Sequence, residues 1–134
     1  ASSKEGIKAQ KEYQKEVKTT QGKLKSKKAE LERLQKEFVK QKASLNASAR
    51  AKKEEKIITL EKDLKRSLED AQETLQRKNA SILGGLLRKL RGVVEEVGRE
   101  GGYALIFEKT GTGVLYADTK VDITDKVVER FDAR

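Results

Sequence analysis

The sequence contains no cysteine and no histidine. These absences exclude thiol nucleophiles, disulfide bonds, zinc sites built from cysteine and histidine, and an imidazole general base. Phosphate-loop, dinucleotide-binding and nucleophile-elbow patterns are missing as well. Carboxylates alone are the remaining candidate catalytic groups, but the acidic residues are spread among lysines at helix-surface spacing, which is typical of solvated helix faces. The sequence therefore predicts a protein that is not an enzyme and that uses neither a metal nor another cofactor.

Proline is also absent, and apolar residues make up only 35% of the chain, against 40% charged residues. This apolar fraction is too small for a conventional globular core in a chain of this length. Abundant Ala, Glu, Lys, Leu and Arg at helical spacing is typical of a long helix or coiled coil. No apolar run is long enough for a membrane span, since even residues 82–90 include two glycines, an arginine and a lysine.

Two long helices are predicted, at about residues 4–43 and 52–98. In the first, apolar residues return every seven positions, which is the repeat of a coiled coil, although many heptads hold only one. These positions are Val17, Leu24, Leu31, Phe38 and Leu45. In the second, the spacing alternates between three and four, through Ile57, Leu60, Leu64, Leu68, Ala71, Leu75, Ile82, Leu86, Leu90, Val93 and Val97. A small, polar stretch between them predicts an antiparallel hairpin with its tip at about residues 44–52; one continuous helix is the alternative.

The pattern changes after the glycines at 101 and 102. Residues 103–108 and 114–117 are predicted strands joined by a turn at 110–113, and residues 125–131 a short helix capped by Asp122 or Thr124. The predicted fold class is therefore α+β. Because a two-stranded hairpin with one short helix is not stable alone, we expect oligomerisation. The predicted oligomer interface is Tyr103, Leu105, Phe107, Val114, Leu115, Tyr116, Val128 and Phe131.

Positive charge is concentrated near the predicted tip. Residues 18–56 hold 13 basic and 5 acidic residues, a net charge of +8, whereas residues 101–134 hold 5 and 6. Concentrated charge of one sign attracts anionic partners, although a solvated helix face that serves only solubility is the alternative. Few aromatic residues interleave with this charge, which argues against stacking on single-stranded nucleic acid; duplex binding through phosphates stays open. The predicted binding residues are Lys18, Lys23, Lys25, Lys27, Lys28, Arg33, Lys36, Lys40, Lys42, Arg50, Lys52, Lys53 and Lys56.

Motifs in the C-terminal part resemble those of one known family. They are Tyr103-Ala-Leu-Ile-Phe-Glu108, Val114-Leu-Tyr-Ala117 and Val121-Asp-Ile-Thr-Asp125, followed by the short helix. Together with the opening Ser3-Lys4-Glu5-Gly6 and the charged hairpin, they make essentially the whole chain similar to the Skp/OmpH family of periplasmic chaperones. The family's first strand and its signal peptide do not precede Ala1 in this sequence.

The resemblance implies a helical-hairpin arm at residues 9–99 on a small β-sheet body formed by residues 1–8 and 100–134. Three chains would assemble as a tentacled homotrimer that holds unfolded outer-membrane β-barrel proteins in the periplasm without ATP, with the basic arm contacting these clients. It also implies contact with lipopolysaccharide or an anionic membrane surface through Lys65, Arg66, Arg77, Lys78 and Lys89. A prefoldin-like or structural coiled-coil module and a basic nucleic-acid-binding protein are the alternatives.

Overall fold

A computed structural model describes residues 3–134, and these residues form two compact units. The hairpin unit is Tyr13–Lys78, and the terminal unit comprises the residues up to Glu12 together with Asn79–Arg134. Two long helices supply residues to both units: α1 spans Lys4–Gln41 and α2 spans Ala47–Gly101. A 3-10 turn, η1, at Thr119–Val121 and the short helix α3 at Thr124–Asp132 belong to the terminal unit.

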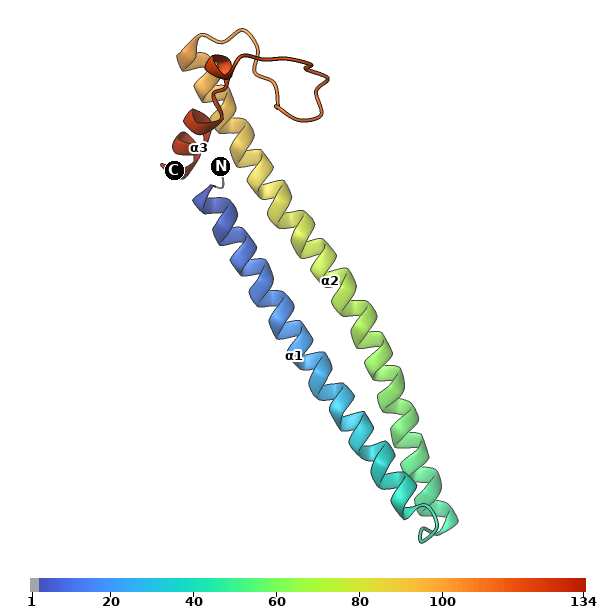
Figure 1. The fold of residues 1–134 in the computed structure, drawn as a ribbon. Coiled ribbons are helices and arrows are strands. Elements are labelled where there is room, and N and C mark those ends of the chain that lie inside the picture. The colour runs from blue at the N-terminus through green and yellow to red at the C-terminus, as the bar shows by residue number, and fades with distance from the viewer. Residues whose placement is uncertain (1–2) are drawn as a thin grey trace. The chain divides into compact units, whose positions relative to one another are not determined.

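In the hairpin unit, α1 and α2 lie side by side and antiparallel, which confirms the predicted helical hairpin (Figure 1). The heptad positions of α1 face α2: Leu31 is buried, and Leu24, Phe38 and their equivalents are partly buried. Three polar contacts cross between the helices where apolar residues are sparse. Lys27 Nζ donates to Ser67 Oγ at 2.6 Å, Gln35 Nε2 donates to Glu61 Oε1 at 2.8 Å, and Lys53 donates to Gln41.

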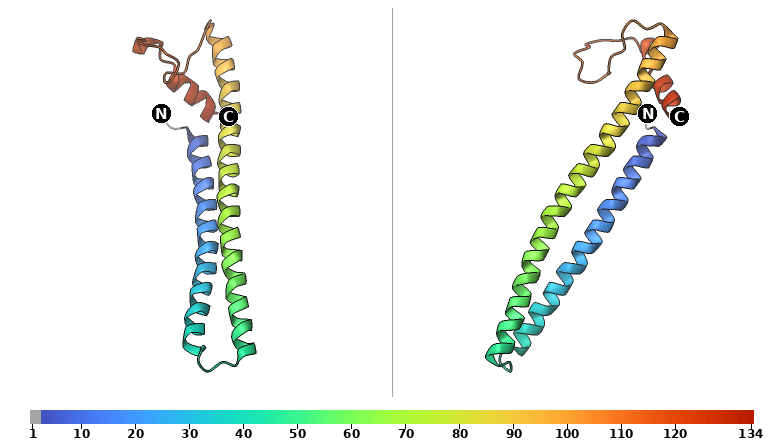
Figure 2. Two further views of the ribbon diagram at one scale, coloured as in Figure 1. Left: turned by 90° about the vertical axis from the view of Figure 1, so that its right-hand side faces the viewer. Right: turned by 180° about the vertical axis from the view of Figure 1, so that it is seen from behind.

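The turn between the helices is short (Figure 2). Two side chains near it, Asn46 and Arg50, hold it in place. Asn46 Oδ1 accepts a hydrogen bond from the Ala49 backbone N–H at 2.8 Å, so Asn46 satisfies one of the donors left free at the start of α2. The Arg50 guanidinium donates to the Lys42 carbonyl at 3.0 Å and so supplies a partner just past the last turn of α1. The chain therefore reverses instead of continuing as one helix.

The largest cluster of buried side chains lies in the terminal unit. Val93 and Val97 of α2 have no exposed surface, and they pack against Val127 and Phe131 of α3. Within each helix the two residues are four positions apart, which places each pair on one helix face. A helix as short as α3 is marginal by itself, so its packing on α2 maintains it.

The predicted α+β fold class, with its small β-sheet body, is wrong: residues 3–134 contain no strand. The segments expected to be strands, 103–108 and 114–117, have irregular backbone, and Leu115 is fully exposed. Their apolar side chains have no layer to cover them within the chain, and two uncovered strands do not make a stable sheet. The glycines at 111 and 113 between them adopt positive φ angles of 86° and 73°, as a tight turn requires.

Candidate functional site

The two units differ in charge. The hairpin unit holds 19 basic and 11 acidic residues, a net charge of +8, whereas the terminal unit holds 12 and 11, a net charge of +1. Within the hairpin unit the whole excess falls at residues 18–56, around the turn; residues 13–17 and 57–78 together hold 6 basic and 6 acidic residues. The positive field of this protein therefore originates in one part of one unit.

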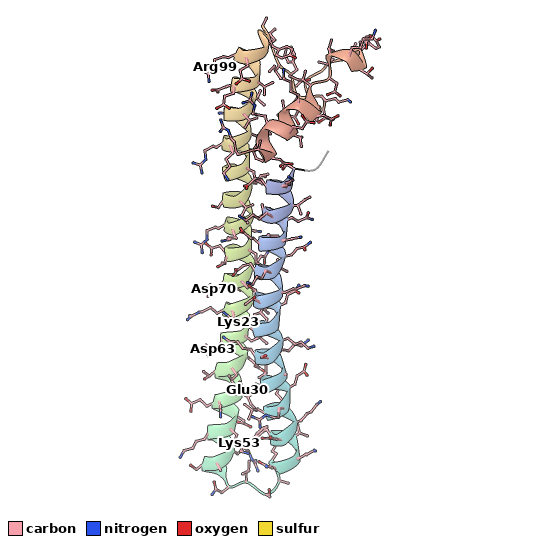
Figure 3. All side chains as sticks on the ribbon, turned by 90° about the vertical axis from the view of Figure 1, so that its left-hand side faces the viewer. Lys23, Glu30, Lys53, Asp63, Asp70 and Arg99 are labelled. Carbon is pink, nitrogen blue, oxygen red and sulfur yellow. The ribbon has the colours of Figure 1, made fainter. Side chains whose placement is uncertain are left out.

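The thirteen predicted basic residues surround this turn, and eleven of them are exposed; Arg50 and Lys53 are partly buried. Charged side chains project from the outer faces of both helices (Figure 3). Among the thirteen, only Arg33 forms a salt bridge within residues 3–134, to Glu37 on the same helix at 2.8 Å. The chain's own carboxylates thus leave most of this charge available to a partner.

Three of the thirteen also hold the hairpin together. Lys27 and Lys53 contact Ser67 and Gln41 across the helix pair, and Arg50 donates to the Lys42 carbonyl at the turn. The Lys42 ammonium lies 5.8 Å from the centre of the Phe38 ring, within the range of a cation–π contact. Replacing any of these side chains would change local structure as well as charge.

The residues predicted to contact lipopolysaccharide do not form one cluster. Lys65 and Arg66 lie more than ten residues before Arg77 and Lys78 on α2, a separation of about 16 Å at the rise of a helix. Arg77 pairs with Glu73 at 3.4 Å. Lys89 lies in the terminal unit, where its ammonium contacts Glu5 at 3.0 Å.

Most of the predicted oligomer interface is exposed in the single chain. Tyr116 is 83% exposed, and Tyr103, Leu105, Phe107, Val114 and Leu115 are exposed as well. Val128 is partly buried and lines an apolar groove of about 210 Å³ with Leu86, Leu87 and Leu90. Phe131, in contrast, is only 5% exposed, because it belongs to the core of its own chain.

Asp122 is a structural residue that the sequence indicated only as a helix cap. Its carboxylate accepts hydrogen bonds from the Thr124 hydroxyl at 2.5 Å and the Thr124 backbone N–H at 3.0 Å. Lys109 Nζ donates to the same carboxylate at 2.9 Å. The Thr124 hydroxyl and then the Lys109 ammonium hold the pKa of Asp122 well below its usual range. These bonds join the irregular segment to the start of α3.

Neither a metal-binding cluster nor a membrane-spanning helix is found in the part of the chain that the structure describes. No group of three or more carboxylates lies close enough to hold a metal ion there. None of the described helices is both long enough and apolar enough to span a membrane. The described residues define a protein built around an antiparallel helical hairpin with a concentrated, largely unpaired positive charge.

Comparison with known protein families shows to which family this helical-hairpin protein belongs. The chain belongs to the family of OmpH-like outer membrane proteins, whose sequence model matches residues 1–131. This is a family of periplasmic chaperones for outer membrane proteins, and its members are not enzymes. The resemblance found in the C-terminal motifs is thereby confirmed. No curated protein matches the sequence.

Proposed function

We propose that this protein is an ATP-independent holdase of the periplasm, which binds unfolded outer-membrane β-barrel proteins and prevents their aggregation. Membership of the OmpH-like family supports the chaperone role. The observation that carries the mechanism is the +8 charge of residues 18–56, which the chain's own carboxylates leave largely unpaired. A holdase has no single fixed ligand, so an extended charged surface suits it better than a closed pocket.

Capture rests on the summed field of this basic region. A single exposed ion pair contributes only about 0–1 kcal/mol, so no individual lysine dominates. Several like charges together raise the association rate of an acidic unfolded chain, and salt weakens that effect. Retention then depends on apolar contacts, which salt does not screen.

A set of charge reversals tests this proposal. Lys23, Lys25, Lys40 and Lys52 are exposed and make no side-chain hydrogen bond or salt bridge within residues 3–134, so their replacement by glutamate leaves the described contacts in place. We expect this fourfold variant to capture an acidic unfolded β-barrel protein severalfold more slowly in stopped-flow fluorescence. Each single Lys→Ala variant should behave as the wild type.

The matched control reverses Lys15, Lys62, Lys65 and Lys78, which are exposed lysines in the balanced part of the hairpin unit. The change in net charge is identical, so a smaller effect on capture would assign the effect to residues 18–56. Equal slowing by both variants would mean that only net charge matters. Unchanged capture by the first variant would reduce the basic region to a solubility device.

We further propose that the chain self-associates as a homotrimer through the exposed apolar side chains of residues 103–116. Leu115 and Tyr116 are the most exposed large apolar side chains in the described residues, and exposed patches of this kind mark interaction sites. Light scattering should report about three chains for the wild type. Leu115→Asp with Tyr116→Asp should dissociate the assembly, whereas Val39→Asp, at an exposed apolar site in the hairpin unit, should not. A wild-type monomer at every concentration would exclude the trimer.

Lipopolysaccharide binding stays a proposal for Arg77 and Lys78, which lie next to each other on α2 and are exposed. Their separation from Lys65 and Arg66 makes this a two-residue contact at most.

A further inference from the structure

Helix α3 makes two kinds of contact with α2 in the terminal unit. Its apolar face, Val127 and Phe131, covers Val93 and Val97. Arg130 and Arg134 pair with Glu100 and Glu96 beside this apolar contact. Both the arginines and the glutamates are four residues apart, so the two pairs fit only one antiparallel register of α3 on α2. These exposed pairs add little stability but specify where α3 docks.

In that register α3 also reaches the start of α1. The Lys4 backbone N–H donates to Asp132 Oδ1 at 2.7 Å, a contact between residues 128 positions apart in the sequence. The first N–H groups of a helix have no partner inside the helix, and a carboxylate there also interacts favourably with the helix dipole. Ser3 Oγ accepts from the Gly6 N–H at 3.0 Å, which is an ordinary local cap. The first turn of α1 therefore receives one cap from its own segment and one from α3.

We infer that α3 is a latch, which caps α1 only while it is docked on α2. The start of α1 and helix α3 then open and close together. Opening would remove the cap from the Lys4 N–H and uncover Val93 and Val97, both fully buried when α3 is docked. The inference concerns the fold of the terminal unit and does not depend on the chaperone role.

Amide hydrogen exchange by NMR on the full chain tests the cap. Asp132→Ala should speed exchange at Lys4 about fivefold, the effect of losing one helix-capping acceptor. Glu129→Ala is the matched control: this side chain is exposed on the same helix and makes no hydrogen bond or salt bridge within residues 3–134. It should leave Lys4 exchange unchanged. A Lys4 amide that is unprotected in the wild type would overturn the inference.

A second variant tests whether α3 and the start of α1 open together, because it weakens the docking of α3 on α2. Val127 belongs to the cluster with Val93 and Val97, so Val127→Ala weakens docking on α2 while leaving the Asp132 carboxylate that caps Lys4 unchanged. Exchange should rise by similar factors at Lys4 and at Ala133, whose N–H donates to the Glu129 carbonyl. Faster exchange at Ala133 with an unchanged Lys4 would refute the latch.

If Val127→Ala does not fold, the Asp132→Ala variant provides a second test of the coupling between α3 and the start of α1. Two elements that open together must affect each other equally, so Asp132→Ala should also speed exchange at Ala133. The same variant should bind more of the dye ANS, because the uncovered valines are apolar. A change at Lys4 with no change at Ala133 would show an isolated cap and would contradict the latch.

Discussion

The glycines of α2 allow a stability prediction that comes directly from the space around them. Gly84 and Gly85 lie inside this helix, and a Cβ atom added at either meets nothing within 4 Å. Glycine inside a helix is less favourable than alanine by about 0.5–1 kcal/mol, chiefly because the unfolded chain loses more freedom. Gly84→Ala with Gly85→Ala should therefore stabilise the protein by about 1–2 kcal/mol.

Thermal unfolding followed by circular dichroism measures this effect. For a chain of this size the gain corresponds to an increase in Tm of roughly 4–8 °C. Protein concentration must be held constant, because self-association makes Tm depend on it. Gly102→Ala is the opposite control: Gly102 follows the end of α2 with a positive φ of 65°, which alanine rarely adopts, so this variant should lower Tm.

An unchanged or lower Tm for the double alanine variant would refute the reasoning. It would mean that the open space beside Gly84 and Gly85 is filled in solution, for instance by another copy of the chain. A higher Tm accompanied by weaker protection of a client would indicate instead that the glycines make α2 bendable for function.

Two further predictions concern the terminal unit. Val97→Ala removes apolar volume from a fully buried site and should lower the free energy of unfolding by about 1.5–3 kcal/mol, measured by urea denaturation, whereas Val39→Ala at an exposed site should change it little; equal effects would contradict the assigned core. The pKa of Asp122 lies below its ordinary 3.8, so its stabilising contribution is present above that pH and is lost as the pH falls through the lowered value. NMR titration of the Asp122 carboxyl should show this low pKa, and Thr124→Val should raise it; an ordinary pKa in the wild type would exclude the hydrogen-bonded geometry.

The helical hairpin could be predicted because its determinants are local. Leu24, Leu31 and Phe38 repeat at seven residues, and this spacing defines a helix face whatever the partner. The polar stretch before Asn46 likewise indicates a turn. Leu68 was expected on the seam, but it is exposed, and Ser67 is the partly buried residue there, where its hydroxyl accepts a hydrogen bond from Lys27 Nζ.

The irregular backbone of the two segments expected to be strands could not be predicted from their local sequence pattern. Residues 103–108 and 114–117 have strand-like composition, but a sheet needs cover for its apolar side chains, and the single chain offers none. The cap that Asp132 provides for α1 could not be predicted either, since Asp132 and its partner Lys4 are 128 positions apart in the sequence. A signal was present, however: Arg130 with Arg134 and Glu96 with Glu100 share a four-residue spacing with opposite charge.

The basic region and its place near the hairpin tip were both predicted from the sequence. The sequence places the excess charge at residues 18–56, and the fold adds that these residues lie within a single compact unit. The fold also distinguishes lysines such as Lys23 and Lys25, which make no side-chain hydrogen bond or salt bridge within residues 3–134, from Lys27 and Lys53, which hold the helices together.

The central claim is that charge in the hairpin unit captures acidic unfolded clients. The most direct measurement is the salt dependence of the association and dissociation rates for an unfolded outer-membrane β-barrel protein, without ATP. Between about 50 and 500 mM salt the Debye length shrinks from beyond 10 Å to a few ångströms, so capture by charge must weaken. We predict that the association rate falls severalfold while the dissociation rate changes little. An association rate independent of salt, with aggregation still suppressed, would contradict the account.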